Sequence, residues 1–182
     1  MRVTITDLSP QEVLRRMADL QSAYEAIYAI PAGGGEGFVP FLIEHSQREG
    51  FRLCAAIDRG SGQMIGFGYG FTGYPGQTWR DSLAEAVGVE MTASWLTGHF
   101  EFAEFGVTPA RRRCGVGTQL YDALFNGLPQ ERAILTVREE NEPARRFYDK
   151  QRWKVLYEGF LTQTGRGPYI IMGKILKEAQ RQ

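Results

Sequence analysis

The sequence HFEFAEFGVTPARRRCGVGTQLY, residues 99–121, decides the fold. Its first part is rich in phenylalanine and therefore β-prone. Pro109 predicts where this strand ends, because proline cannot donate a hydrogen bond to a neighbouring strand. From Val116 onward apolar residues recur every four positions, at Leu120 and Leu124, which predicts a helix. The stretch therefore predicts a strand, a loop and the start of a helix, in that order.

The loop of this stretch has the composition of an anion site. Gly115 and Gly117 fall at the predicted helix N-terminus, where the first backbone N–H groups have no partner within the helix. Glycine lets a phosphate approach these groups, and the three preceding residues, Arg111, Arg112 and Arg113, add charged donors. These residues predict a pyrophosphate site. The alternative is a tight turn that needs glycine, beside arginines on a solvated face.

Two other phosphate-binding motifs do not match this loop. A P-loop requires a lysine directly after its last glycine, and no lysine follows Gly117. A dinucleotide-binding fingerprint requires a third glycine at the position where Leu120 stands. The loop therefore belongs to another class of phosphate site, or to none.

The composition is that of an ordinary globular chain. The 182 residues are 43% hydrophobic and 23% charged, with a formal net charge of zero. The length predicts one domain over residues 1–182, and the neutral charge gives no reason to expect nucleic acid or an anionic membrane as partner. No apolar run approaches the length needed to span a bilayer, and residues 1–10 lack the apolar core that a signal peptide would have, so we expect neither. We expect a cytoplasmic protein without a metal site, because Cys54, Cys114 and two histidines offer too few ligands.

The remaining segments alternate between helical and strand patterns. Ser9, Pro10 and Glu12 form a capping box that predicts a helix up to Pro31, which a glycine-rich connector follows. Further helices are predicted over 38–48 and from 141, and strands over 2–7, 51–57, 64–71, 133–137, 153–161 and 169–176.

Two of these segments are unusual. In the strand over 64–71, Gly66, Gly68 and Gly70 share one face, which either a packed helix or a ligand could approach closely. Residues 73–98 fit no simple strand, and Asp81 to Val87 could form one or two helical turns. A segment of this length predicts a lid, a substrate wall or a plain insertion that covers a sheet edge.

The arginine-glycine loop matches a known signature. Arg112, Gly115 and Gly117 fit [R/Q]-x-x-G-x-[G/A], directly after a strand that ends in V-x-P. This pattern resembles the acetyl-CoA loop of the GNAT superfamily of N-acetyltransferases. A second GNAT motif, N-x-x-A-x-x-x-Y, is expected in the helix after the next strand.

Asn141, Ala144 and Tyr148 meet this second motif. The chain departs from the family at two positions. Arg152, followed by Trp153, stands where the family usually has glycine and phenylalanine, and Arg113 stands where many members have glycine. Because arginine adopts a left-handed backbone less easily than glycine, we expect the turn at Arg152 to differ in shape.

The order of the predicted elements is similar to that of a complete GNAT domain. The resemblance implies an α/β fold of the acyl-CoA N-acyltransferase type, with a central mixed sheet of about seven strands flanked by about four helices. Residues 73–98 would then be an insert on the acceptor side of a single domain.

The resemblance also implies which residues hold acetyl-CoA. The strand end would contact the pantetheine arm, the loop would bind the pyrophosphate through backbone N–H groups, and the second motif would line the other side of the cofactor. In that order, the residues are Phe105, Gly106 and Val107; Arg112, Arg113, Cys114, Gly115, Val116, Gly117 and Thr118; and Asn141 and Phe147.

Acyl transfer from a thioester to an amine requires a base, a donor to the oxyanion and an acid. The resemblance implies Glu101 as an acceptor-facing carboxylate and Tyr148 as the acid for the thiolate. Glu104 is a second candidate base, although strand alternation puts it opposite Glu101 unless a bulge resets the parity. A backbone N–H near Phe105 or Gly106 would polarise the thioester carbonyl. The alternatives are exposed or ion-paired glutamates and a core tyrosine.

His99 could also be a base, but at the start of a strand we expect it to be exposed. The sequence therefore predicts an N-acetyltransferase that moves an acetyl group from acetyl-CoA to a primary amine of a small molecule or peptide, by direct attack in a ternary complex. The alternatives are a non-catalytic acyl-CoA sensor of the same fold, an acyltransferase for longer acyl-CoA, and an interaction domain that uses the 73–98 insert. A homodimer is left open.

Overall fold

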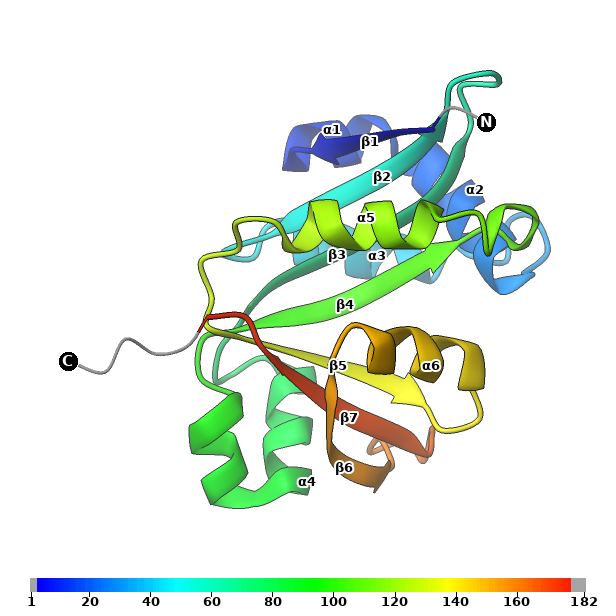
Figure 1. Ribbon diagram of the computed structural model, residues 1–182. Helices are drawn as coiled ribbons and strands as arrows, with labels where there is room; N and C mark the ends of the chain where they lie inside the picture. Colours follow the sequence, from blue (N-terminus) through cyan, green and yellow to red (C-terminus); the bar gives the residue numbers. More distant parts are fainter. Residues whose placement is uncertain (1–2, 178–182) are drawn as a thin grey trace. The chain divides into compact units, whose positions relative to one another are not determined.

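Seven strands form one mixed sheet in the computed structural model, which describes residues 3–177 (Figure 1). Their order is β1-β2-β3-β4-β5-β7-β6; β4 and β5 are parallel, and β1–β2, β2–β3, β5–β7 and β6–β7 are antiparallel. The predicted mixed α/β fold is confirmed, although residue 2 of the first predicted strand lies outside the described residues. The bounds are β1 (Val3–Leu8), β2 (Arg52–Asp58), β3 (Met64–Gly73), β4 (His99–Val107), β5 (Arg132–Arg138), β6 (Lys154–Phe160) and β7 (Tyr169–Ile175).

The part of the chain that the structure describes contains six α-helices, more than the four or so predicted. They are α1 (Pro10–Arg15), α2 (Met17–Tyr28), α3 (Phe38–Ser46), α4 (Thr78–Trp95), α5 (Val116–Phe125) and α6 (Glu142–Lys150). The number is higher because Arg16 interrupts the first predicted helix, with φ −104° and ψ 19°, and because the 73–98 segment contains α4. Of these six helices, none is both long and apolar enough to cross a membrane.

The chain divides into two compact units. Unit 1 consists of the residues up to Phe71 together with Ala103–Leu128, and unit 2 consists of Thr72–Phe102 together with the residues from Pro129 onward. Strand β4 begins in unit 2 and ends in unit 1. The two candidate carboxylates on this strand therefore belong to different units.

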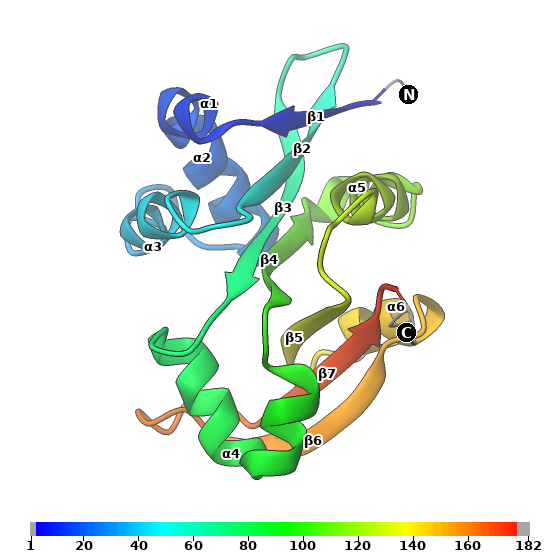
Figure 2. The same cartoon turned by 90° about the vertical axis from the view of Figure 1, so that its left-hand side faces the viewer.

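In unit 1, helices cover both faces of the strands (Figure 2). α1, α2 and α3 lie on one face and α5 lies on the other. Leu20, Leu42 and Phe67 are fully buried in the cluster beneath α1–α3. Leu120 and Leu124 of α5 are fully buried as well, as their four-residue spacing predicts. Removing these side chains from water supplies the main stabilising free energy of the unit.

The glycine-rich connector between α2 and α3 folds around one carboxylate. Glu25 Oε1 accepts hydrogen bonds from the Gln21 amide at 2.9 Å and from the N–H groups of Gly33 at 3.0 Å and Gly35 at 3.1 Å. These donors, led by Gln21, hold the pKa of the buried Glu25 below its usual value. The N–H groups of the connector are thus occupied by an internal anion, so the connector is not a phosphate loop.

His45 of α3 makes the stability of unit 1 depend on pH. The Tyr69 hydroxyl lies 3.0 Å from its Nδ1, and burial, followed by the charge of Arg48, lowers the His45 pKa from 6.5 to about 4. Between these values the unfolded chain binds a proton that the folded chain does not. We therefore expect the free energy of unfolding to fall as the pH falls through this range, by less than about 1.4 kcal/mol per pH unit because the ring is partly exposed.

Urea unfolding across that pH range measures the dependence, with His45→Gln as the control. Glutamine keeps a hydrogen-bonding group beside Tyr69 but does not titrate. The variant should lose stability less steeply than the wild-type protein as the pH falls. Equal slopes for the two proteins would contradict the assignment.

In unit 2, α4 and α6 lie on opposite faces of the strands (Figure 2). Leu83 of α4, Ile134 of β5 and Ile171 of β7 are fully buried in one cluster, which defines the α4 face. On the α6 face, the ring of Phe102 lies 6.2 Å from the ring of Tyr148, centroid to centroid. Each face of unit 2 therefore has its own apolar contact with a helix.

Helix α4 fills most of the 73–98 segment. It bends at Gly88, whose φ of 81° is left-handed, and Figure 2 shows two helical segments joined at this bend. The buried Arg80 guanidinium donates two hydrogen bonds, of 3.1 and 2.8 Å, to the Leu96 carbonyl. These bonds tie the beginning of α4 to the residue that follows its end, so the segment is an ordered helical element.

The turn after α6 contains a left-handed residue. Arg152 has φ 61°, the conformation that a glycine would adopt, so the expectation that arginine would reshape this turn is wrong. A left-handed backbone costs a residue with a Cβ roughly 1 kcal/mol. We therefore expect Arg152→Gly to raise the free energy of unfolding by up to about 1 kcal/mol and the melting temperature by about 2–4 °C.

Thermal unfolding checks this prediction against a neighbouring position. Gln151 has φ −82°, an ordinary value, so Gln151→Gly should lower the melting temperature. A decrease for both variants would show that the left-handed backbone of Arg152 carries no cost.

Candidate active site

The predicted anion loop follows β4 and is anchored to the sheet. After β4 the chain makes a single 3₁₀ turn, Pro109–Arg111, and α5 begins at Val116. The Thr108 N–H donates to a carbonyl of β3 at 2.9 Å. Between the turn and the helix, Arg113 and Gly115 have left-handed backbones, with φ 58° and 79°. Alternation of left-handed with ordinary residues curls successive N–H groups toward one concavity, the geometry of an anion nest.

Six consecutive backbone N–H groups of this loop, from Arg113 to Thr118, have no hydrogen-bond partner among the described residues. The N–H of Arg112 before them donates to the Pro109 carbonyl at 3.3 Å, and that of Gln119 after them donates to the Gly115 carbonyl at 3.1 Å. Unpaired N–H groups at a helix N-terminus carry partial positive charge. The row is therefore suited to a bound anion.

The three arginines of the loop have different partners. Arg111 pairs with Asp58 at the end of β2, with 2.6 Å between Nη2 and Oδ2. Arg112 donates to the carbonyl at the end of β4 at 3.0 Å and to the Ile27 carbonyl at 2.8 Å, so its guanidinium braces the loop. Arg113 is exposed, and its side chain has no partner within residues 3–177. Of the three, Arg113 is thus the one available to a phosphate.

The end of β4 packs against the glycine face of β3. A Cβ at Gly66 would lie 2.8 Å from the Gly106 carbonyl oxygen. A Cβ at Gly68 would lie 2.7 Å from the Phe105 ring and 3.4 Å from Leu124 of α5. A neighbouring strand and a helix therefore occupy this face, and no room is left on it for a ligand.

Glu104, one of the two candidate bases, lies in unit 1 and is partly buried. The Tyr28 hydroxyl of α2 donates a hydrogen bond to its Oε1, and burial raises the pKa of Glu104 above its usual value. Burial and the charge of Glu104 also raise the pKa values of Tyr24 and Tyr69. A carboxyl with a raised pKa, among aromatic hydroxyls, is suited to proton exchange closer to neutral pH.

Glu101, the other candidate, lies in unit 2 and is buried with His99. The distance between His99 Nε2 and Glu101 Oε2 is 2.8 Å. The expectation that His99 is exposed is wrong, since its exposed fraction is 0%. The imidazole fits because β3 has glycine beside it: a Cβ at Gly73 would lie 2.3 Å from His99 Cε1.

Tyr148 is buried on the face opposite Glu101. Glu101 is level with Ile134 in the parallel β4–β5 ladder, so both side chains lie on the α4 face. Phe102, the next residue along the strand, lies on the α6 face, where its ring meets that of Tyr148 edge to face, at 81°. Trp153 also packs on Tyr148, with 6.0 Å between centroids.

Asn141 and Phe147, the two residues that the resemblance places beside the cofactor, are at least partly exposed. Asn141 is the N-cap of α6, and its Oδ1 accepts a hydrogen bond from the Ala144 N–H at 3.2 Å. Two residues of the second motif, Asn141 and Ala144, thus form one helix cap. Phe147 is partly exposed and stands edge to face with Tyr148, with 5.7 Å between centroids.

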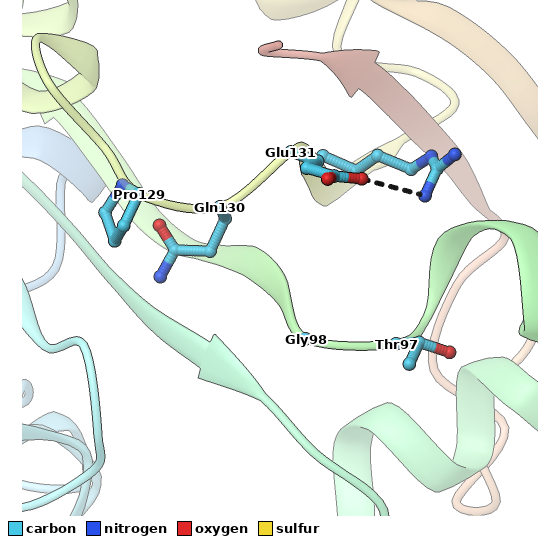
Figure 3. Close-up of a pocket in the computed structure, with 6 residues that line it drawn as sticks. Thr97, Gly98, Pro129, Gln130 and Glu131 are labelled. Atoms are coloured by element: carbon cyan, nitrogen blue, oxygen red, sulfur yellow. Dashed lines mark ion pairs between the residues drawn. The ribbon is translucent and has the colours of Figure 1, made fainter. Parts of the chain in front are cut away.

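A pocket of about 250 Å³ lies in unit 2 and contains none of the predicted site residues (Figure 3). In this pocket Gln130 and Glu131 point away from each other, and Glu131 lies 3.9 Å from Arg132. Gln130 donates to the Thr72 hydroxyl at 2.9 Å, while its Oε1 has no partner among the described residues. The pocket is lined by Thr97, Gly98, Pro129, Gln130, Glu131 and Arg132.

The predicted site residues thus form one group in each unit. Unit 1 holds Glu104, the end of β4 and the anion loop, and unit 2 holds Glu101, Tyr148 and the cap of α6. Sequence reasoning missed the partners of both carboxylates. The two-residue spacing of His99 and Glu101 could have indicated a shared strand face, but no pattern in the sequence indicates the bond from Tyr28 to Glu104.

Comparison with known proteins finds relatives of this chain and of its fold. The chain is 23% identical to the GCN5-like protein acetyltransferase Rv2170 of Mycobacterium tuberculosis, over 97% of this chain and 99% of that protein. Its fold is similar to the ribosomal-protein-S18-alanine N-acetyltransferase of Escherichia coli, with a TM-score of 0.64, 17% identity, and coverage of 98% of this chain and 96% of that one. It is also similar to Arabidopsis thaliana NAA60 in complex with acetyl-CoA, with a TM-score of 0.61, 17% identity, and coverage of 96% and 98%.

The family model described as "Acetyltransferase (GNAT) family" matches residues 17–152, which include both predicted motifs. The predicted mixed sheet of seven strands agrees with the fold of these acetyltransferase structures. The chain belongs to the GNAT family of acetyltransferases.

Proposed function

We propose that this protein transfers an acetyl group from acetyl-CoA to a primary amine of a peptide or small molecule, by direct attack in a ternary complex. The observation that carries the proposal is the row of six unpartnered N–H groups in the signature loop. A pyrophosphate offers enough acceptor oxygens to pair with such a row. Acetyl-CoA is thus the donor that best fits both the family and the loop.

The residues proposed to hold acetyl-CoA divide by chemistry. The loop N–H groups and the Arg113 guanidinium would take the phosphates, while the other arginines keep the loop in shape. Phe105 and Gly106 lie at the end of β4 and are partly exposed, and they would contact the pantetheine arm. Asn141 and Phe147 remain proposed contacts on α6.

The proposed chemistry accounts for every proton. A carboxylate on β4 takes one proton from the acceptor ammonium, and the amine nitrogen then forms its bond to the thioester carbon. As the carbon–sulfur bond breaks, its electron pair goes to sulfur, and the Tyr148 phenol gives the sulfur a proton. The second proton of the nitrogen restores the phenol, and the carboxyl releases its proton to solvent.

The two carboxylates are supported by different observations. Glu104 has a raised pKa, which favours proton uptake nearer neutral pH, but Tyr28 donates to its Oε1. Glu101 lies on the face of β4 opposite the one that meets Tyr148. In acyl transfer the amine approaches the thioester carbon from one side and the thiolate leaves from another, so the base and the acid are expected on different sides. We therefore propose Glu101 as the base and Glu104 as the alternative.

The acceptor is proposed to approach on the α4 face of unit 2. Glu101 lies on this face, so α4 would form the acceptor-side insert of a single domain. The Mycobacterium tuberculosis relative is described as a protein acetyltransferase, which supports a protein or peptide amine as the first acceptor to test.

Incubation with acetyl-CoA and an amine panel tests the proposal, with free thiol as the readout. The panel should contain peptides with a free N-terminus, peptides with an internal lysine, polyamines and aminoglycosides. Release of CoA thiol that depends on one of these amines is the expected result. Binding of CoA without turnover would favour the sensor alternative, and faster turnover of longer acyl-CoA would favour the acyltransferase alternative.

A further inference from the structure

His99 Nε2 and Glu101 Oε2 lie 2.8 Å apart. A carboxylate that serves as a base is ionised and can only accept a hydrogen bond, so the proposed role of Glu101 requires Nε2 to be the donor. His99 Nδ1 is enclosed and has no partner among the described residues. Among the described residues, His99 therefore makes its side-chain hydrogen bond through Nε2, to the carboxylate, and makes none through Nδ1.

The two oxygens of Glu101 differ in their surroundings. Oε2 is held by His99, whereas Oε1 has no hydrogen-bond partner in the described part of the chain. Glu101 as a whole is buried, with an exposed fraction of 3%. The pair thus clamps one oxygen and leaves the other without a hydrogen-bond partner in the described part of the chain.

Stability alone does not account for this pair. A buried polar pair is often no more stabilising than apolar side chains of the same volume, and the unpaired Nδ1 adds a further desolvation cost. The neighbouring residues on the same face, such as Ile134, show that apolar packing is available there. The ring also requires glycine at position 73 of β3.

We infer that His99 is a positioning residue for the reaction: it holds Oε2 of Glu101 so that Oε1 is presented to the acceptor ammonium. This inference rests on the proposed function, and it assigns His99 no contact with the substrate. The Nε2–H group of His99 donates to Oε2 and so fixes the rotamer of Glu101. In that rotamer Oε1 is the oxygen that accepts the proton of the ammonium.

Four variants test the inference: His99→Phe, His99→Gln, Glu101→Gln, and the double variant His99→Phe with Glu101→Gln. We expect His99→Phe to lower kcat by about 10- to 100-fold with little change in KM for acetyl-CoA. His99→Gln should recover most of this loss, because its amide N–H can donate to the same oxygen. In the Glu101→Gln background, His99→Phe should cause no further loss.

A purely structural role for His99 makes a different prediction. It would lower kcat by a similar factor in both backgrounds, and the loss would follow the melting temperatures of the variants rather than the presence of a donor. That result, or an unchanged kcat for His99→Phe, would overturn the inference while leaving the proposed function in place. If the wild-type protein turns over no amine, both the proposed function and the inference fail.

The hydrogen bond itself can be measured without turnover. The chain has two histidines, so the ¹⁵N spectrum of the imidazoles contains two side chains, and the His45→Gln variant assigns them. We expect His99 to be protonated at Nε2 in the wild-type protein. Protonation at Nδ1 alone would overturn the inference, because Nε2 could then not donate to Glu101.

Discussion

Replacing Tyr148 with phenylalanine is expected to lower kcat for acetyl transfer by about 100-fold or more, while KM for acetyl-CoA changes little. General acid catalysis contributes roughly 100- to 10,000-fold, and the departing thiolate would lose its proton donor. The substitution removes one oxygen and keeps the ring, so the edge-to-face contacts with Phe102 and Trp153 remain. The loss should therefore reflect chemistry and leave folding intact.

The same chemical change at Tyr157 is the matched control. Tyr157 belongs to β6 of the same unit, is 38% exposed, and has no proposed role. Tyr157→Phe should leave kcat unchanged, and both variants should melt close to the wild-type temperature. A Tyr148→Phe variant with wild-type kcat would remove Tyr148 from the mechanism and restore the interpretation of a core aromatic.

A negative charge placed in the anion loop should weaken acetyl-CoA binding strongly. Gly117 lies in the first turn of α5, and an added Cβ would come no closer than 3.9 Å to Val107 and 4.0 Å to Phe105. Gly117→Glu is therefore accommodated by the fold and improves helix propensity. Charge repulsion from bound phosphate should raise Kd by about 10- to 100-fold, as measured by calorimetry.

Gly117→Gln separates charge from size. Glutamine has the same shape as glutamate without the charge, so its Kd should stay within about tenfold of the wild-type value. The difference between the two variants should shrink as salt is added, since ions screen exposed charges. Equal Kd values for the glutamate and glutamine variants would contradict a phosphate site in this loop.

The sequence was sufficient where a local rule sets the structure. The capping box at Ser9 starts α1 because its two hydrogen bonds depend only on residues three apart. The spacing of Leu120 and Leu124 predicted the buried stripe of α5 for the same reason. The loop at Gly115 was recognisable because a left-handed residue at a helix N-terminus favours glycine.

The sequence was not sufficient where no local pattern marks the structure or where contacts between distant residues set it. Only one or two turns of α4 could be predicted, because Arg80 and Leu83 are its only buried residues in the described structure and no apolar stripe repeats along it. The break at Arg16 follows no proline or glycine. The bond from Tyr28 to Glu104 joins residues 76 apart, and no local pattern could reveal it.

The contact between His99 and Gly73 limits the order in which this protein can change during evolution. Any side chain at position 73 would overlap the imidazole, with a Cβ 2.3 Å from Cε1 and 2.5 Å from Nε2. A lineage that lost the histidine first could then accept alanine or serine at position 73, and would thereafter be unable to regain the histidine in one step. Positions 73 and 99 should therefore covary among related proteins, with glycine wherever histidine is kept.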